Sequence, residues 1–306
     1  MRNRFAEVIY KAAVKDERIC IVVADISPAG PMAKFREEFP ERFINVGVAE
    51  QSMIGICAGL ALRGMRPFAY TIATFALYRP YEFVRDDLCY QNLPVTVVGI
   101  GGGVIYSTLG GTHYAQEDIT IASSMPNMTV LAPCDPAESA AITDWIAGRP
   151  EGQAGPIYLR FGKAGEPDIT QGAEPFRFGK LRYLRRGKDA AVLSYGVVLG
   201  MAAKVADALQ AKGKSVSLVG CPTVKPLDRE GIAELLKTHA QVLVIEENAP
   251  TGGLASAVKE IAWDRRASCD LKTFTLKDEF VHCYGSHEEL LAKHGISVPA
   301  ILAAAG

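Results

Sequence analysis

Short runs of apolar residues alternate with longer stretches of helical periodicity along the chain. In the first half, five apolar runs predict strands: 18–24, 67–72, 94–100, 128–131 and 157–160. Four segments space their apolar residues as helices do: 3–15, 49–63, 76–92 and 136–147. Such alternation predicts right-handed βαβ units, and therefore an α/β fold with a mostly parallel sheet covered on both faces.

The alternation stops over residues 161–187, which are rich in glycine, proline and charge, and then resumes. Later strands are expected at 190–195, 215–219, 241–245 and 271–275, and later helices at 198–212, 228–238 and 253–263. A chain of 306 residues is long enough for two hydrophobic cores. The pattern predicts two doubly wound α/β domains, 1–160 and 188–306, joined by a linker over 161–187.

Composition narrows the class of protein. Hydrophobic residues make up 49% and charged residues 22%, which is typical of a globular protein. The net charge of −1 gives no reason to expect nucleic acid or a membrane surface as partner, and no apolar run reaches the roughly 18 residues of a membrane span. The first residues lack the apolar stretch of a secretory signal. Seven cysteines, an odd number spread through apolar segments, indicate reduced thiols, so we expect a cytoplasmic protein.

Several motif-like segments fail their tests. The run GIGGGV (99–104) follows a predicted strand, but no frame places the third glycine that G-x-G-x-x-G requires. Gly213-Lys214-Ser215 ends like a P-loop, but the glycine required five positions earlier is Ala208. His282, Cys283 and His287 lack a second ligand cluster that would complete a four-coordinate metal site. We therefore expect neither nucleotide motif and no metal site in this chain.

A single carboxylate opens a long apolar helix. Glu50 precedes a run of small and apolar residues, and Asn45 or Gly47 could begin the helix that carries it. We expect this helix to be packed closely on several sides. A carboxylate in the first turn interacts favourably with the helix dipole, so the spacing alone favours a helix-start glutamate.

Three further sets of residues are candidates for a site. His113 lies in the glycine-rich loop GGTHYAQED after a strand, where α/β proteins place ligands, although a surface histidine would look the same. Phe75, Tyr78 and Arg79 form an aromatic and basic cluster, although aromatics at this spacing are usually core. Asp25 ends the first predicted strand, which also suits a simple loop-start aspartate.

The amino-acid sequence around these residues resembles that of the thiamine-diphosphate-dependent family of transketolases and 1-deoxyxylulose-phosphate synthases. Residues 42–51, RFINVGVAEQ, match the family's R-F-x-N-x-G-x-A-E-Q, whose glutamate activates the cofactor. The His113 loop is similar to its G-x-T-H-Q segment, with Tyr114 replacing Gln, and TFALYRPYEF is similar to its F-x-x-x-R-x-Y-D/E-Q, with Phe83 replacing Gln. ADISPAG resembles A-D-L-x-x-S. The resemblance covers residues 5–300, including PLD (226–228) and EEN (246–248), to which we assign no chemistry.

This resemblance implies a role for each candidate. Glu50 would hydrogen-bond a ring nitrogen of the aminopyrimidine of thiamine diphosphate, so that the thiazolium carbon can lose its proton. Phe75, or Tyr78 if the register differs, would stack on the aminopyrimidine, with Arg79 and Asp25 also at the cofactor. His113 would bind the substrate and shuttle protons.

The family's motif for Mg²⁺ and the diphosphate, Gly-Asp-Gly, does not occur in these residues. The resemblance therefore implies the pyrimidine-binding plus C-terminal subunit of a split transketolase. An N-terminal transketolase subunit would supply the diphosphate site with its Mg²⁺ or Ca²⁺, in a hetero-oligomer with two copies of each subunit. This chain alone would then be inactive.

Departures from the family's pattern bear on the substrate. Transketolases grip the sugar phosphate with a serine, a histidine and an arginine, which fall here on Ala29, Gly101 and Ala132; the aspartate that reads the C2 hydroxyl falls near Leu109. Each charged contact to phosphate is worth roughly 1.5–3 kcal/mol. We expect transfer of a two-carbon ketol or acyl unit from a ketose or 2-oxo donor to an aldehyde-type acceptor other than the standard pentose phosphates, unless Arg85 or the partner restores an anion site.

Two other functions stay open. The chain could be the β subunit of a 2-oxoacid dehydrogenase, although GGTHYAQED differs from the G-x-H-S-Q form usual in those subunits. It could also be a non-catalytic α/β subunit of the same fold, although the presence of Glu50 and His113 argues against lost chemistry.

Overall fold

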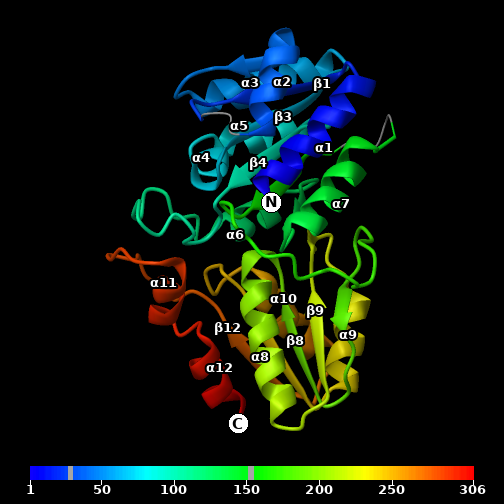
Figure 1. The fold of residues 1–306 in the computed structure, drawn as a ribbon, viewed down its shortest axis with the longest axis vertical. Helices are drawn as coiled ribbons and strands as arrows, with labels where there is room; N and C mark the ends of the chain where they lie inside the picture. Colours follow the sequence, from blue (N-terminus) through cyan, green and yellow to red (C-terminus); the bar gives the residue numbers. More distant parts are fainter. Residues whose placement is uncertain (27–29, 151–154) are drawn as a thin grey trace.

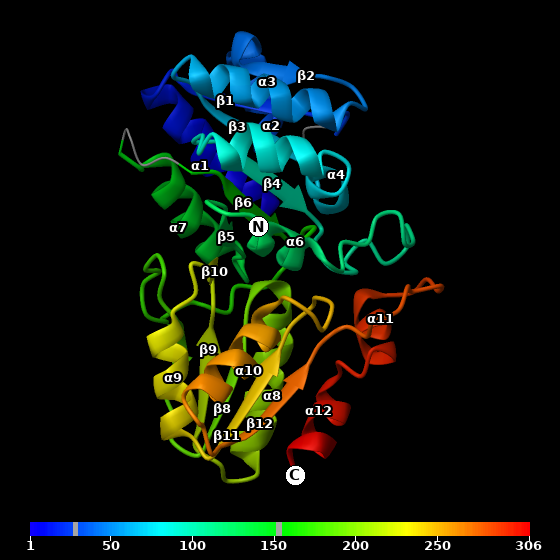
Figure 2. The same ribbon diagram turned by 180° about the vertical axis from the view of Figure 1, so that it is seen from behind.

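The computed structural model describes residues 1–26, 30–150 and 155–306. Two α/β lobes are stacked along the long axis, with the first half of the chain forming one lobe and most of the second half the other (Figure 1, Figure 2). This arrangement confirms the predicted fold class of two mostly parallel sheets with helices. Among the described residues, no helix is long and apolar enough to cross a membrane.

The first lobe is built on a seven-stranded sheet in the order β10-β5-β6-β4-β3-β1-β2. Its strands are β1 (Ile19–Val23), β2 (Phe43–Asn45), β3 (Arg66–Ile72), β4 (Thr96–Ile100), β5 (Thr129–Leu131), β6 (Ile157–Phe161) and β10 (Thr223–Lys225). Every neighbouring pair is parallel except β10 and β5. Because β10 comes from the second half of the chain, the edge of this sheet ties the two lobes together.

Alternate residues of these strands face two helical layers. Ile21 and Phe68 belong to the apolar cluster that includes residues of α1, α2 and α7, whereas Val22 and Ala69 belong to the cluster that includes residues of α3 and α4. Successive side chains of a strand point to opposite faces, so both faces of this sheet are apolar and buried. The helices of this lobe are α1 (Arg2–Lys15), α2 (Pro31–Glu38), α3 (Glu50–Leu62), α4 (Ala73–Leu77), α5 (Tyr81–Phe83), α6 (Asp118–Ser124) and α7 (Pro136–Ala147).

Local chemistry explains where several helices begin. The Asp135 side chain accepts a hydrogen bond from the backbone N–H of Glu138 at the start of α7. Helix α3 begins at Glu50 itself, because Asn45 ends β2 and Gly47 takes a positive φ of 70° between the two elements. The single helix predicted over 76–92 is wrong: α4 ends at Leu77, and Pro80 precedes α5, which runs into a π-helical turn, η2 (Val84–Tyr90).

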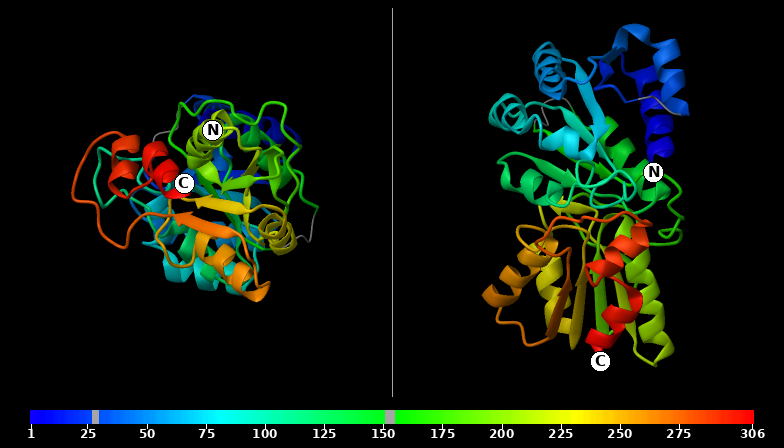
Figure 3. Two further views of the ribbon diagram at one scale, coloured as in Figure 1. Left: turned by 90° about the horizontal axis from the view of Figure 1, so that it is seen from below. Right: turned by 90° about the vertical axis from the view of Figure 1, so that its left-hand side faces the viewer.

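The second lobe contains a five-stranded sheet in the order β12-β11-β8-β9-β7. Its strands are β7 (Arg182–Arg185), β8 (Ala190–Ser194), β9 (Val216–Gly220), β11 (Gln241–Ile245) and β12 (Asp270–Phe274), of which only β7 is antiparallel to its neighbour. Its helices are α8 (Leu199–Ala211), α9 (Arg229–Thr238), α10 (Leu254–Asp264), α11 (His287–Lys293) and α12 (Val298–Ala305). The red C-terminal helix lies on the outside of this lobe (Figure 3). Strand β7 lies within 161–187, so that segment is not wholly irregular.

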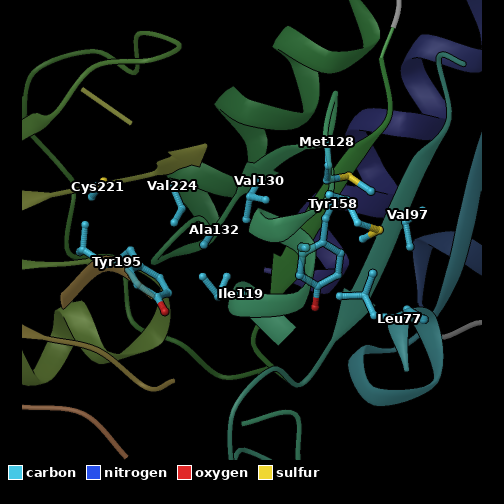
Figure 4. Close-up of a cluster of buried hydrophobic side chains, with 14 of the residues drawn as sticks. Leu77, Val97, Ile119, Met128, Val130, Ala132, Tyr158, Tyr195, Cys221 and Val224 are labelled. Carbon is cyan, nitrogen blue, oxygen red and sulfur yellow. The ribbon is translucent and has the colours of Figure 1, made fainter. Parts of the chain in front are cut away.

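A hydrophobic cluster runs continuously between the lobes. Tyr195 and Val224 of the second half lie beside Ile119 and Ala132 of the first (Figure 4). The buried ion pair between Arg182 of β7 and Glu138 of α7, at 2.8 Å, joins the lobes at another point. The domain limits 1–160 and 188–306 stay a proposal, because apolar and ionic contacts of this kind cross them.

Candidate active site

The carboxyl ends of neighbouring parallel strands bring the main candidates together. Glu50 begins the helix after β2, Phe75 and Arg79 follow β3, and His113 lies in the loop between β4 and α6. The order of strands reverses between β1 and β3, since β2 adds on one side of β1 and β3 on the other. Ligands in open α/β sheets bind outside the carboxyl ends of strands at such a point.

Glu50 is a buried carboxylate held by one cation. Nη1 of Arg79 donates to Oε2 of Glu50 at 2.7 Å, and the two side chains are 41% and 2% exposed respectively. Within the described residues, Oε1 of Glu50 accepts no hydrogen bond. This carboxylate therefore has a fixed orientation and one oxygen available to a ligand.

The Phe75 ring lies between Arg79 and His113. The Arg79 guanidinium is 4.6 Å from the centre of the Phe75 ring, a favourable cation–π distance. The rings of Phe75 and His113 are 5.3 Å apart with an interplanar angle of 70°, which is an edge-on arrangement. Glu50, Arg79, Phe75 and His113 thus form a continuous row of contacts, which we call the Glu50–His113 row.

His113 has one ring nitrogen available. Its Nδ1 lies 3.0 Å from Oγ1 of Thr112, and Nε2 has no hydrogen-bond partner among the described residues. The centre of the Tyr106 ring is 6.4 Å from that of the imidazole, with an interplanar angle of 70°. A histidine arranged in this way can donate a proton to a ligand or accept one from it.

Two of the predicted cofactor residues have their hydrogen-bond partners outside this row. The Tyr78 hydroxyl donates to Oε2 of Glu117 at 2.8 Å and accepts from the Glu117 backbone N–H at 3.0 Å. Burial raises the pKa of Tyr78, and Glu117 adds to the rise, so this side chain braces the loop after His113 as a neutral phenol. Asp25 is exposed, with a positive φ of 45°, and its N–H donates to the Asn45 side chain at 3.2 Å.

Of the four positions expected at the substrate, the three that the structure describes differ in their burial and surroundings. Gly101 has a φ of +75°, and a Cβ there would come within 2.2 Å of the Tyr106 ring, so that ring occupies the space of a side chain at 101. Leu109 is 48% exposed in the loop between Tyr106 and His113. Ala132 is completely buried between the lobes (Figure 4). Ala29 lies outside the described residues.

The sequence did not predict two cationic residues beside Tyr106, which are Arg2 and Lys163. Nε of Arg2 is buried without a hydrogen-bond partner among the described residues, and the charge of Arg2 opposes the rise that burial causes in the pKa of Tyr106. The Nζ of Lys163 lies 5.5 Å from the centre of the Tyr106 ring. Arg2 begins a surface helix and Lys163 falls in the expected linker, so no local pattern marks either residue.

The chemistry of these side chains suits an aminopyrimidine ring. A ring nitrogen that carries a proton can donate a hydrogen bond to the free oxygen of Glu50, and the half-buried Phe75 supplies an aromatic ring in the same row of contacts. In the part of the chain that the structure describes, no group of three His, Cys, Asp or Glu side chains could hold a metal ion. The residues present therefore fit the pyrimidine half of thiamine diphosphate.

The chain is similar to known proteins over almost its whole length. Residues 1–165 match the transketolase pyrimidine-binding domain and residues 179–301 the transketolase C-terminal domain. One subunit of the apulose-4-phosphate transketolase of Actinobacillus succinogenes is 32% identical over 99% of this chain and 96% of that protein. The 6-deoxy-6-sulfo-D-fructose transketolase subunit SqwH of a Clostridium strain is 32% identical over 100% of this chain and 93% of its own length. The chain spans only 46% of the 1-deoxy-D-xylulose-5-phosphate synthase of Oleidesulfovibrio alaskensis, at 33% identity.

Solved structures extend the likeness to the fold. A split-gene transketolase, solved as an inactive β4 tetramer, superposes with a TM-score of 0.87 and 31% identity over 99% of this chain and 96% of that one. The transketolase of Campylobacter jejuni shares the fold over 98% of this chain and 45% of its own, with a TM-score of 0.74 and 18% identity. The chain therefore belongs to the transketolase family and combines its pyrimidine-binding and C-terminal domains.

Proposed function

We propose that this chain is the pyrimidine-binding subunit of a split, thiamine-diphosphate-dependent transketolase. The enzyme would transfer a two-carbon ketol, or an acyl unit, from a ketose or 2-oxo donor to an aldehyde-type acceptor. The observation that carries the proposal is the Glu50–His113 row at the carboxyl ends of the strands. When bound, the cofactor would supply a carbon nucleophile able to attack the donor's carbonyl group.

In this proposal the residues of the row divide the work of holding the cofactor. Oε1 of Glu50 binds the proton of a pyrimidine ring nitrogen, while Arg79 fixes the other oxygen at 2.7 Å. Because Glu50 is almost completely buried, water does not compete for that proton. The Phe75 ring packs on the pyrimidine.

His113 would serve the substrate. Its Nδ1 is engaged by Thr112 at 3.0 Å, which leaves Nε2 to hydrogen-bond the carbonyl or hydroxyl of the sugar. The same imidazole nitrogen can donate a proton at one stage of the reaction and take it back at another.

A partner subunit is supported by the uncovered face of α3. Ile56 and Leu62 on this helix are 37% and 63% exposed, and a Cβ at Gly55 or Gly59 would meet no heavy atom within 4 Å. The helix expected to be packed closely on several sides therefore presents a smooth apolar face to solvent in the isolated chain. We propose that this face packs in a hetero-oligomer with an N-terminal transketolase subunit, two copies of each, which supplies the diphosphate site and its Mg²⁺ or Ca²⁺. The relatives that are named as single subunits of transketolases support this arrangement.

We place the assembly in the cytoplasm. All seven cysteines are free, and five of them are buried. Thiols that persist unpaired are typical of a reducing compartment.

The proposed acceptor or donor is a sugar that carries one terminal anion and is not a standard pentose phosphate. Tyr106 fills the space at Gly101, and Ala132 is buried, so two of the family's phosphate contacts are replaced by apolar packing. Arg2 and Lys163 beside Tyr106 could balance a single anionic group. Two relatives are named for apulose 4-phosphate and for a sulfofructose, which each carry one such group.

Co-expression with an N-terminal-type subunit tests the proposal. The purified complex should hold thiamine diphosphate, whereas the chain alone should hold none, and the complex should prefer a non-standard sugar over xylulose 5-phosphate and ribose 5-phosphate. Turnover by the chain alone would overturn the split arrangement. A strong preference for the pentose phosphates would overturn the substrate proposal, and decarboxylation of 2-oxo acids without transfer to an aldehyde would favour a 2-oxoacid dehydrogenase subunit.

A further inference from the structure

The EEN motif at the end of β11 lies directly under the glycine loop that follows β4. Oε1 of Glu247, a completely buried residue, accepts the backbone N–H of Val104 at 2.7 Å. Gly103 takes a φ of +71°, and a Cβ there would lie 2.3 Å from the Glu247 carboxyl carbon. The glycine loop of the first lobe therefore packs directly against the Glu247 carboxylate of the second lobe.

Among the described residues, one side chain, that of His287, contacts the oxygens of this carboxylate. Nε2 of His287, the first residue of α11, lies 2.8 Å from the same Oε1, while Oε2 of Glu247 is buried without a partner among the described residues. Burial lowers the pKa of His287, but the Glu247 carboxylate outweighs that effect and raises it. Arg160 faces the pair as well, and its Nη2 donates to the backbone oxygen of Glu247 at 2.9 Å; Glu288 also acts on His287.

A second set of contacts connects this ion pair to His113. Gly103 N–H donates to the Ala115 oxygen at 2.9 Å, and Ala115 N–H donates to the Gly103 oxygen at 2.7 Å. Ala115 is two residues from His113. The segment before α11 also touches this loop, because the Tyr114 hydroxyl donates to the Cys283 oxygen at 3.2 Å. The loop and that segment project side by side from the same side of the molecule (Figure 1, Figure 2).

We propose that Glu247 and His287 are positioning residues that hold the glycine loop and, through the paired hydrogen bonds of Gly103 and Ala115, set the place of His113. The catalytic meaning of this clamp rests on the proposed function, whereas the clamp itself is a property of the chain. The proposal assigns a role to the EEN motif and to His287, for which the sequence predicted no function.

The ion pair makes an asymmetric prediction. Replacing His287 by glutamine removes the cation that contacts the Glu247 carboxylate. The remaining cation, Arg160, is paired with Asp118 and bonds only the backbone oxygen of Glu247, so Glu247 is expected to take up a proton or the loop to open. Glu247→Gln keeps the shape and an oxygen acceptor for Val104, and removes the charge that needs balancing. The double variant should therefore behave better than His287→Gln alone, which is the opposite of additive damage.

Hydrogen exchange of the full-length chain tests the clamp without any activity. In His287→Gln, peptides covering 101–116 should exchange about tenfold faster, and the double variant should return within about threefold of the original chain. The matched control is Glu138→Gln, which breaks another buried ion pair between the lobes, 2.8 Å from Arg182, and does not touch the loop. Unchanged exchange in His287→Gln, or the same acceleration in Glu138→Gln, would overturn the proposal.

The reconstituted complex tests the link to catalysis. His287→Gln should lower kcat about tenfold with cofactor content unchanged, and the double variant should recover it. His287→Lys keeps a cation that titrates at higher pH, so the alkaline limb of the pH profile should move upward. Recovered exchange without recovered kcat would overturn the role in positioning His113. If the original complex shows no transfer activity at all, the proposed function fails, and the exchange results still decide the clamp.

Discussion

Replacing Gly101 by alanine should destabilise the chain much more than the same change at a glycine of similar conformation. Gly101 has a φ of +75°, and an added Cβ would meet the Tyr106 ring at 2.2 Å. Gly64 has a φ of +86° and nothing within 4 Å, so Gly64→Ala is a control for the conformational cost alone. A side chain in the left-handed region costs roughly 1–2 kcal/mol.

The clash with Tyr106 adds a second cost. Forcing extra atoms into a packed site typically costs about 1–3 kcal/mol, so Gly101→Ala should lower the free energy of unfolding by about 2–5 kcal/mol in total. In a Tyr106→Ala background the cost at Gly101 should fall to that of Gly64→Ala, because the ring is gone. Urea unfolding followed by circular dichroism measures the three free-energy differences: Gly101→Ala and Gly64→Ala in the original chain, and Gly101→Ala in the Tyr106→Ala background.

The reasoning fails if Gly101→Ala and Gly64→Ala have the same effect, because the ring would then not occupy that space. It also fails if removing Tyr106 leaves the cost at Gly101 unchanged. Either result would contradict the explanation that the Tyr106 ring occupies the space where the family has a phosphate-binding histidine at position 101. One argument for an unusual substrate would then be lost.

Three further predictions concern charges. Glu50→Gln should lower turnover of the complex by about 10²–10⁴-fold and leave the melting temperature of the chain nearly unchanged, because it removes a proton acceptor but keeps the side-chain shape. Arg160→Met should cost about 3–5 kcal/mol in thermal or urea unfolding, because the completely buried Asp118, 2.8 Å from Arg160, loses its cation. The stabilising effect of His287 and Glu247, measured as the difference between the original chain and His287→Gln, should be greatest at about pH 4.5–6.5 and decline on both sides.

The sign of the pH prediction follows from the two directions of shift. Burial lowers the pKa of His287 and its contact with Glu247 raises it, with a net rise, so that contribution is complete below about pH 6.5 and is lost as pH rises through the raised value. Burial raises the pKa of Glu247 and His287 lowers it, with a net fall, so that contribution is present above about pH 4.5 and is lost as pH falls through the lowered value. A difference that is flat from pH 4 to 9 would contradict the ion pair.

Controls separate these effects from general damage. Glu41→Gln changes an exposed carboxylate outside the Glu50–His113 row and should leave turnover unaffected. Lys204→Met breaks an exposed ion pair with Glu288, 3.1 Å apart, and should change stability by no more than about 0.5 kcal/mol. An equal loss in Lys204→Met and Arg160→Met would contradict the importance assigned to burial.

The sequence predicted the buried apolar strands, including the three-residue β5, and missed the short strands β2, β7 and β10. The runs that became β1, β3, β4 and β6 were found, and each is paired on both sides by parallel strands. Strand β10 has three residues, comes from the second half of the chain and pairs with β5 in the sheet of the first lobe. Local periodicity does not signal a pairing between residues so far apart in the sequence.

The site was predicted in the same uneven way. Recognisable sequence motifs contain Glu50, Phe75, Arg79 and His113, and the structure brings these residues into one row of contacts. Tyr106 and its two neighbouring cations stand in no motif, because their proximity depends on how helix α1 and the segment after β6 fold back over the glycine loop. Sequence motifs identify residues that are close together along the chain. Tertiary packing determines which residues from distant segments lie beside them.

The most direct test of the central claim is the amount of thiamine diphosphate bound per copy of this chain, alone and in complex with an N-terminal transketolase subunit. We predict about one cofactor per copy in the complex and none in the isolated chain, because the proposed pyrimidine site lies in this chain whereas the described residues contain no group of metal-binding side chains. A stoichiometric amount in the isolated chain, or none in a stable complex, would contradict the account.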